Sequence, residues 1–287
     1  MQDIYQETKY IMNKYKIKAN KSLGQNFLVS QQVVDNIVES SEITKEDLVI
    51  EIGPGLGTLT KELLDRAGKV ICIELDKNMI KILEDRFSLY NNFEIIFNDV
   101  LKVDLNKIIK EEKENNNLKN AKIVANLPYY ITTPIIMKLL EEKLDLESIT
   151  VMIQKEVADR LIAIPGEKNT GAITYAVYYY SVAEKILEVP KESFIPEPEV
   201  TSEVIKLNIR KNEIVNVTDK ELMFKIIKNA FMQRRKTLLN SLANAKIFKS
   251  KEEGKEILEK LGLDENIRAE KLSLKEFAEM TNLLILK

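Results

Sequence analysis

The sequence predicts an α/β fold with a mostly parallel sheet, followed by a small all-helical domain. Strand and helix patterns alternate from about residue 30 to residue 210, which is typical of a sheet whose crossovers are helices. The strand candidates are almost continuously apolar, as a sheet buried on both faces requires. After Arg210 only helical patterns remain. We therefore divide the chain into a domain over 1–210, which begins with a basic arm of about 1–28, and a helical domain over 211–287.

Each predicted element rests on a short local pattern. Helical periodicity is found at 58–67 and 77–87. The proline-rich link 190–199 is expected to be a surface crossover, because proline fits neither a central strand nor a helix. The polar insert 110–120 is predicted to be a loop. The strand candidates are 48–52, 70–74, 93–97, 122–126 and 149–153, with two later ones at 182–189 and 201–209.

The C-terminal domain shows two helix signals. Apolar residues recur at helical spacing between Leu222 and Phe231, which predicts a helix with one buried face. Ser273 and Glu276 have the spacing of a capping box, which predicts the start of a last helix.

Composition excludes several kinds of chemistry. The chain has no histidine and one cysteine, so a zinc site of the usual kind and a Ser-His or Cys-His pair are not available, and we expect no metal. Cys72 lies in an apolar strand pattern and is interpreted as a buried small side chain. The first residues do not resemble a signal peptide and no stretch has the length of a membrane span, so we expect a cytoplasmic protein without a membrane partner. Nothing requires more than a monomer.

Positive charge is concentrated in two acid-free stretches. Residues 8–34 contain five lysines, Lys21 among them, and residues 225–251 contain eight basic residues that include Arg234, Arg235 and Lys236. Two solvated faces would be the simplest explanation, but such a face usually mixes signs. We therefore favour contacts with phosphate groups.

A glycine-rich loop follows the first strand of the sheet. Gly53, Gly55 and Gly57 allow a tight turn and a close approach of a ligand at the carboxyl end of the strand, although a purely structural turn is an alternative. Glu74, at the end of the next strand, could accept hydrogen bonds from ribose hydroxyls, and Asp99, after the third, could accept one from an adenine amino group. Acid-lined walls suit the sulfonium cation of S-adenosylmethionine better than the pyrophosphate of NAD.

The segment 125–130, with the sequence ANLPYY, ends the fourth strand at the same edge. The Asn126 side chain and the Leu127 carbonyl could accept both N–H bonds of an exocyclic amino group, while Pro128 fixes the chain direction and Tyr129 stacks on the base. Such acceptors would localise the nitrogen lone pair, so positioning and electrostatics could replace a general base. A proline turn with buried aromatic residues is the alternative. A base in a duplex would have to be flipped out to reach this pocket.

The sequence resembles the ribosomal RNA adenine dimethyltransferases. The motifs that carry the resemblance run from about residue 18 to the C-terminus, and those of the C-terminal half are similar to the KsgA/RsmA branch rather than to the Erm resistance methylases. They are GQNFL (24–28), EIGPGLGTLT (51–60), ELD (74–76), ND (98–99), NLPYY (126–130), FIPEPEVTSEVIKL (194–207), AFMQRRKTLLNSL (230–242) and IRAEKLSLKEF (267–277).

The resemblance implies a Rossmann-like class I methyltransferase domain and a helical domain that binds rRNA or the ribosome. It implies dimethylation of N6 of two adjacent adenosines in the 3′-terminal hairpin of 16S rRNA, in the small subunit or its precursor, and a role in subunit biogenesis. By the same resemblance, Asn26 and Leu28 join Gly53, Gly55, Glu74, Asp99 and Asn126 around S-adenosylmethionine. Phe194 matches a second aromatic that would sandwich the base with Tyr129; a buried loop anchor is its alternative.

Other functions remain possible on the sequence alone. An Erm-like 23S rRNA or DNA adenine methyltransferase would share the site, and glutamine N-methylation of a protein would fit it too, although the basic stretches disfavour a protein substrate. A ribosome-assembly factor without activity would keep the fold. A dehydrogenase is disfavoured by the loop spacing, because a third glycine of the dinucleotide fingerprint would fall at Thr58.

Overall fold

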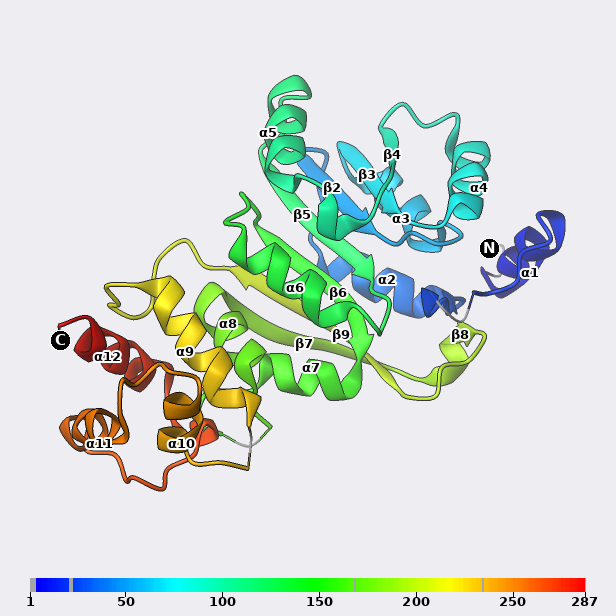
Figure 1. The fold of residues 1–287 in the computed structure, drawn as a ribbon. Helices are drawn as coiled ribbons and strands as arrows, with labels where there is room; N and C mark the ends of the chain where they lie inside the picture. The colour runs from blue at the N-terminus through cyan, green and yellow to red at the C-terminus, as the bar shows by residue number, and fades with distance from the viewer. Residues whose placement is uncertain (1–3, 21–22, 168, 234, 287) are drawn as a thin grey trace. The chain divides into compact units, whose positions relative to one another are not determined.

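The computed structural model describes residues 4–20, 23–167, 169–233 and 235–286. The chain forms two compact units (Figure 1). Unit 1 comprises Met1–Ala158 and Ala183–Ile209, and unit 2 comprises Asp159–Val182 and Arg210–Lys287. The sequence placed its domain boundary at residue 210, whereas the structure groups residues 159–182 with the helical unit.

The centre of unit 1 is a seven-stranded sheet in the order β4-β3-β2-β5-β6-β9-β7 within the described residues. The five strands β4, β3, β2, β5 and β6 are parallel to one another, and β9 pairs antiparallel with β6. All seven predicted strands are confirmed. They are β2 (Asp47–Ile52), β3 (Lys69–Glu74), β4 (Phe93–Phe97), β5 (Asn120–Asn126), β6 (Ser148–Gln154), β7 (Ser181–Val189) and β9 (Ser202–Ile209).

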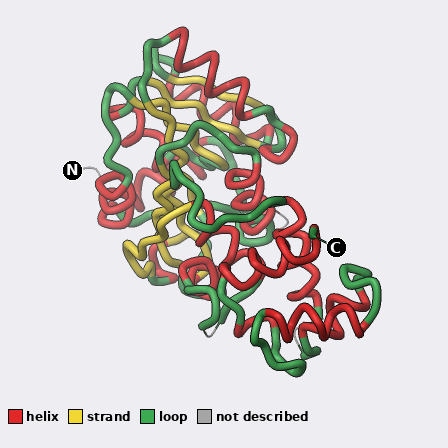
Figure 2. The backbone as a smooth tube through the Cα atoms, turned by 90° about the vertical axis from the view of Figure 1, so that its left-hand side faces the viewer, coloured by secondary structure: helices red, strands yellow, loops and turns green. Residues whose placement is uncertain are grey.

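Helices cover both faces of the sheet, as the apolar strands require (Figure 2). One core cluster joins α2, α3 and α4 to alternate strand residues such as Val49 and Val124. The residues between them, such as Ile50 and Ile123, are just as buried on the other face, where α5 lies against β2 and β5. The helices of unit 1 are α1 (Ile4–Lys14), α2 (Gln31–Ser40), α3 (Thr58–Arg66), α4 (Lys77–Phe87), α5 (Leu105–Asn115) and α6 (Thr132–Glu141), and α7 (Lys155–Ile162) continues from unit 1 into unit 2.

Two loop predictions are corrected by the structure. Residues 110–115 are helical, because α5 begins at the N-cap Asp104 and buries Leu105 and Ile109. Lysine and glutamate are good helix formers, so one short apolar stripe is enough to fix a helix whose outer face is polar. The link 190–199 is not wholly a surface crossover: it contains β8 (Phe194–Ile195), which pairs antiparallel with β1 (Phe27–Leu28).

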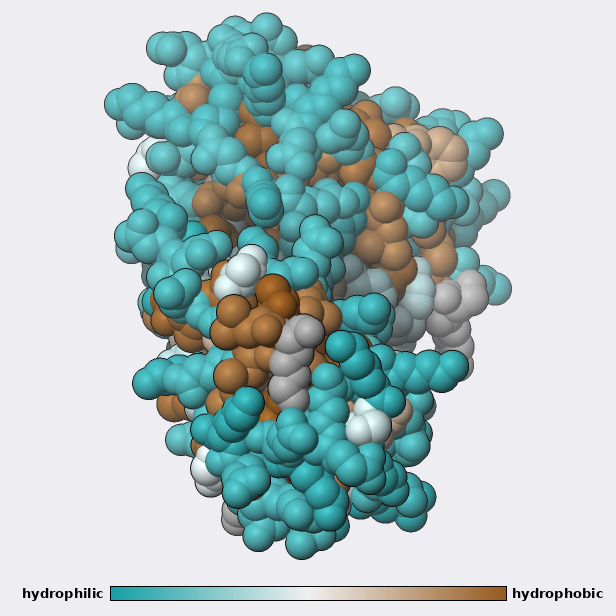
Figure 3. All heavy atoms as spheres, turned by 60° about the vertical axis from the view of Figure 1, so that its left-hand side comes forward, coloured by the Kyte–Doolittle hydropathy of each residue, from teal (hydrophilic) through white to brown (hydrophobic). Residues whose placement is uncertain are grey.

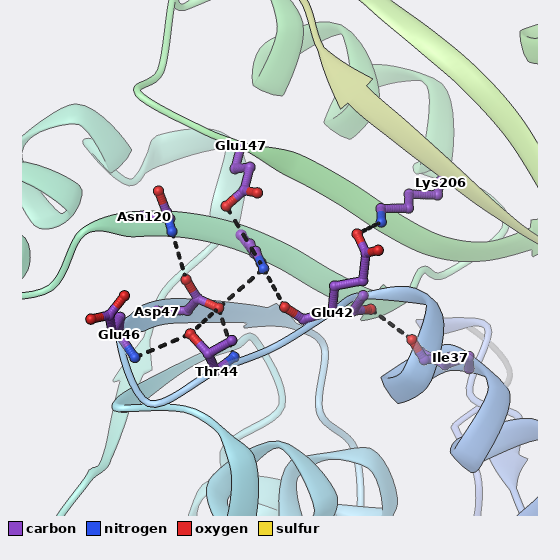
Figure 4. Close-up of polar contacts among 10 residues, drawn as sticks. Ile37, Glu42, Thr44, Glu46, Asp47, Asn120, Glu147 and Lys206 are labelled. Carbon is purple, nitrogen blue, oxygen red and sulfur yellow. Dashed lines mark hydrogen bonds and ion pairs between the residues drawn. The ribbon is translucent and has the colours of Figure 1, made fainter.

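A buried polar cluster lies at the amino ends of the parallel strands, opposite to the edge where the glycine loop begins (Figure 4). Lys122 Nζ lies 3.0 Å from Asp47 Oδ2 and donates to the Glu42 carbonyl at 2.6 Å. Burial raises the pKa of Asp47, but hydrogen bonds from Asn120, Thr44 and Lys122 lower it further than burial raises it. The cluster fixes the start of β2 and β5 and so the position of their far ends.

Unit 2 is helical and has its own core. The predicted stripe is confirmed, since α9 buries Met223, Ile226, Ile227 and Ala230. The capping box at Ser273 is also confirmed. Tyr175 of α8 is fully buried and donates to the Leu272 carbonyl at 2.6 Å. The elements are α8 (Ala172–Tyr180), α9 (Lys220–Met232), α10 (Leu238–Asn244), α11 (Lys251–Lys260) and α12 (Leu274–Ile285), with short 3₁₀ turns at Val100–Lys102 (η2), Lys191–Ser193 (η3) and Ala269–Lys271 (η4).

The outer surface is mainly hydrophilic, although hydrophobic side chains gather in the middle of the face drawn in Figure 3. The exposed hydrophobic residues include Ile285 and Leu286 at the end of α12. Among the described residues, none of the helices combines the length and the apolar character needed to span a bilayer.

Candidate active site and cofactor crevice

A crevice lies at the carboxyl ends of β2, β3 and β5, wholly within unit 1. The empty space in the crevice and its open mouth is about 1090 Å³. The parallel sheet brings the segments of the site to one edge, as the strand order predicted. The predicted site residues that line it are Asn26, Leu28, Gly53, Gly55, Glu74, Asp99, Asn126, Leu127, Pro128 and Tyr129.

The glycine loop takes a conformation that other residues rarely adopt. Gly53, Gly55 and Gly57 have φ of 67°, 58° and 81°. A Cβ on Gly55 would lie 3.4 Å from the Phe27 ring, and a Cβ on Gly57 would lie 2.5 Å from the ring of Phe87. The first two glycines leave an open floor for a ligand, whereas Gly57 is needed for the packing of α3 against α4.

Glu74 is held in one position by the backbone around it. Its Oε1 accepts from Leu75 N and Asp76 N at 2.8 Å each, and its Oε2 accepts from Gly55 N at 3.3 Å. Burial raises its pKa, although these three donors oppose the shift. Glu74 thus presents a fixed carboxylate that fits a pair of hydroxyl donors.

Asp99 lies after β4 and lines the same crevice. Its Oδ1 accepts from Leu101 N at 3.0 Å and caps the 3₁₀ turn η2. Only one carboxylate oxygen is needed for the cap, so the other can accept from a ligand.

Asn126 is the last residue of β5, and its amide is oriented by the 24–28 loop. Its Nδ2 donates to the Asn26 carbonyl at 3.3 Å, which leaves Oδ1 as the acceptor. The Pro128 carbonyl accepts from Ile131 N and Thr132 Oγ1. The Leu127 carbonyl, in contrast, has no hydrogen bond from the part of the chain that the structure describes. The two acceptors that the sequence singled out are therefore both available.

Tyr129 is anchored through its hydroxyl. The phenol oxygen lies 2.5 Å from Ser202 Oγ on β9, and Ser202 is fully buried. Burial raises the pKa of Tyr129, so the ring stays neutral at physiological pH. Sequence reasoning missed Ser202, because nothing in a serine near the start of a strand predicts which side chain it will meet.

Phe194 is not in the crevice. Its side chain is 2% exposed and belongs to the core cluster that also contains Phe27 and Leu28. In this structure it occupies the position of a buried loop anchor, and its contact with a base remains a prediction that would require its side chain to turn.

Glu51 is a second residue that sequence reasoning missed. This carboxyl is 2% exposed, lines the crevice, and accepts from Thr60 Oγ1 at 2.6 Å; Cys72 Sγ lies 3.5 Å from the same oxygen. Burial raises the pKa of Glu51 to about 7. The sequence did contain a signal for it, because Glu51 is an acid inside the apolar pattern of β2. Cys72 itself is buried as predicted.

The predicted RNA-binding residues lie elsewhere. Arg235 and Lys236 are exposed between α9 and α10 of unit 2. Lys21 and Arg234 fall outside the described residues. Their contact with RNA remains a prediction.

The residues present fit S-adenosylmethionine. Glu74 and Asp99 carry carboxylate oxygens that could accept from a ribose and from an adenine amino group, and the glycine loop leaves room for a ligand between them. Glu51 also lines this space, and a buried acid beside it suits a cation. Next to it, Asn126 and Leu127 offer two acceptors for a planar amino group.

Comparison with known proteins gives three concordant results. The family model for ribosomal RNA adenine dimethylase matches residues 16–286. The chain is 47% identical over 281 residues to ribosomal RNA small subunit methyltransferase A of Alkaliphilus oremlandii, covering 98% of this chain and 97% of the relative. It is 47% identical over 277 residues to the protein of the same name from Clostridioides difficile, covering 96% and 94%.

Solved structures agree in fold. A dimethyladenosine transferase from Plasmodium falciparum superposes with a TM-score of 0.72 at 27% identity, covering 88% of this chain and 95% of that one. The 23S rRNA methyltransferase ErmE superposes with a TM-score of 0.66 at 23% identity, covering 91% and 100%. The second likeness shows the class I methyltransferase fold alone.

Proposed function

The chain belongs to the ribosomal RNA adenine dimethylase family, and from that premise we propose that it dimethylates N6 of adenosine in small-subunit rRNA. The cofactor is S-adenosylmethionine, which supplies the methyl group when bound. We further propose that the target is a pair of adjacent adenosines in the 3′-terminal hairpin of 16S rRNA, within the small subunit or its precursor, and that the modification takes part in subunit biogenesis.

The orientation of Asn126 carries this proposal. Asn126 lines the crevice, and because its Nδ2 is bound to the Asn26 carbonyl, its Oδ1 is left to act as an acceptor. With the Leu127 carbonyl it can accept both N–H bonds of an adenine amino group, which draws the nitrogen toward tetrahedral geometry and localises its lone pair. The proton released on transfer is acidic enough to leave to water, so histidine is not needed.

The remaining residues position the two reactants. Glu74 and Asp99 bind the adenosyl group, Asn26 and Leu28 close the crevice beside it, and Tyr129 stacks on a flipped base. The hydrogen bond to Ser202 holds the plane of the Tyr129 ring. Pro128 fixes the chain between the two acceptors and the ring.

Unit 2 is the proposed rRNA-binding part of the protein. Arg235 and Lys236 are exposed there, in an acid-free stretch that could neutralise phosphates. A monomeric cytoplasmic enzyme would be sufficient for this role.

The direct test is methylation of undermethylated small subunits with labelled S-adenosylmethionine, followed by mass mapping of the rRNA. We expect N6,N6-dimethyladenosine at two adjacent positions, and loss of transfer with Asn126→Ala while cofactor affinity is less affected. Label in 23S rRNA or DNA would instead indicate an Erm-like or DNA enzyme. Absence of label together with tight binding to the subunit would indicate an assembly factor without activity.

A further inference from the structure

The segment 23–28 lines the crevice, and we call it the roof; it is anchored at three places. The Phe27 ring packs against Gly55 of the glycine loop, and its backbone pairs with Ile195 of β8. The Asn26 carbonyl accepts from Asn126 at the end of β5. The third anchor is Gln25, which reaches the end of β3. The first two anchors are buried or continuous with the core, whereas the third is a single polar bond.

Gln25 uses both ends of its amide. Its Oε1 accepts from Asn20 N at 2.8 Å, and its backbone N–H donates to the Asn20 carbonyl at 3.2 Å, so both its side chain and its backbone bind Asn20. Its Nε2 donates to Asp76 Oδ2 at 2.8 Å across 51 residues of sequence. Because Oε1 is already used, the amide cannot be flipped without losing the bond to Asn20.

Asp76 divides its two oxygens in the same way. Its Oδ1 caps α4 by accepting from Asn78 N at 2.9 Å, while Oδ2 receives Gln25. Asp76 also follows Glu74 closely, and its backbone N–H is one of the donors that hold the Glu74 carboxylate. Gln25 lines the crevice and Asp76 directly follows the lining residue Leu75, so the bond between them joins the roof to the end of β3 beside the proposed ribose-binding carboxylate.

We propose that the hydrogen bond between Gln25 and Asp76 is the gate of the cofactor crevice, opening for cofactor entry and for product exit. The inference rests on the proposed function, because a base that receives two methyl groups needs the cofactor exchanged between the two transfers. The gate consequently controls how fast the second methyl group can follow the first. Gln25 and Asp76 are positioning residues and take no part in the transfer itself.

Three variants test the gate. Asp76→Asn keeps the Oδ1 cap of α4 but turns an amide N–H₂ toward Gln25 Nε2, so two donors face each other. Gln25→Glu places two carboxylates side by side. The double variant Gln25→Glu/Asp76→Asn restores the bond with donor and acceptor exchanged. In it, the amide introduced at position 76 can donate to one oxygen of the new carboxylate at position 25, while the other oxygen still accepts from Asn20 N.

The measurement is surface plasmon resonance of S-adenosylmethionine on the immobilised full-length protein. Loss of one such bond is expected to raise the association and dissociation rates together by about fivefold in each single variant, with a change in Kd of less than about twofold. Equal acceleration in both directions is the signature of a gate, because a bond that must open for entry and for exit slows both steps alike. The double variant is expected to return both rates to those of the wild type.

Several outcomes would overturn the proposal. If only the dissociation rate rises, Gln25 contacts the cofactor and does not gate it. Unchanged rates in both single variants would show that the roof does not limit exchange. The exposed Gln32→Glu serves as the control for added charge, and an equal effect there would also refute the gate. A wild-type protein that does not bind S-adenosylmethionine would refute the proposed function instead.

Discussion

Replacement of Glu51 by glutamine tests the electrostatics at the floor of the crevice. Both hydrogen bonds to Glu51 end on Oε2, from the Thr60 hydroxyl and the Cys72 thiol. The single carbonyl oxygen of glutamine can accept both, so Glu51→Gln removes the charge and keeps the contacts. Any change in stability then reports on the cost of the buried charge.

The magnitude follows from the pKa. Burial raises the pKa of Glu51 from 4.5 to about 7, and each unit is worth about 1.4 kcal/mol, so the buried charge costs roughly 3 kcal/mol. The folded-state pKa lies above the unfolded one, so the protein is more stable when Glu51 is protonated. This extra stability of the wild type is fully present below pH 4.5 and is lost as the pH rises to 7. Glutamine does not titrate, so the Glu51→Gln variant loses no stability from this position over the same pH range.

The assay is urea denaturation followed by circular dichroism at pH values from about 4.5 to 8, since the chain has no tryptophan. We expect the free energy of unfolding of Glu51→Gln, relative to wild type, to rise by about 3 kcal/mol across this range. The exposed Glu84→Gln is the control for net charge and should show no such rise. A difference between Glu51→Gln and wild type that stays constant with pH would refute the reasoning.

Three other substitutions probe separate contacts. Ser202→Ala should lower the methyl-transfer rate about fivefold with little change in the KM for the cofactor, because the Tyr129 ring loses its anchor. Tyr129→Phe should lower the rate equally, and the double variant should lower it no further. Additive losses in the double variant would contradict the idea that the two residues act through one hydrogen bond. Lys122→Met should destabilise the protein by about 3–5 kcal/mol in urea, because Asp47 remains buried without its cation. Adding Asp47→Asn to this variant should restore the free energy of unfolding. If it does not, packing and not the ion pair dominates. Gly57→Ala should cost about 1–3 kcal/mol, because φ is 81° and the Cβ would strike a core ring; an unchanged Tm would contradict this.

The sequence by itself determined the architecture and most of the motifs that line the crevice. Apolar strands separated by helical patterns require a parallel sheet, and parallel strands place their carboxyl ends at one edge. Motifs that are distant in sequence, such as Gly53, Glu74 and Asn126, therefore had to meet there. The physical reason is periodicity: each element buries the face that its own residues define, whatever the details of the loops.

Only the tertiary structure decided how the side chains pair. The bonds between Asn26 and Asn126, and between Gln25 and Asp76, join residues 100 and 51 positions apart. Their partners depend on loop paths over the sheet, which no local pattern encodes. The same is true of Phe194. The sequence shows that it is aromatic, but its burial followed from the pairing of β8 with β1. Hydrogen bonds act over about 3 Å, whereas sequence periodicity locates a residue only to a face of an element.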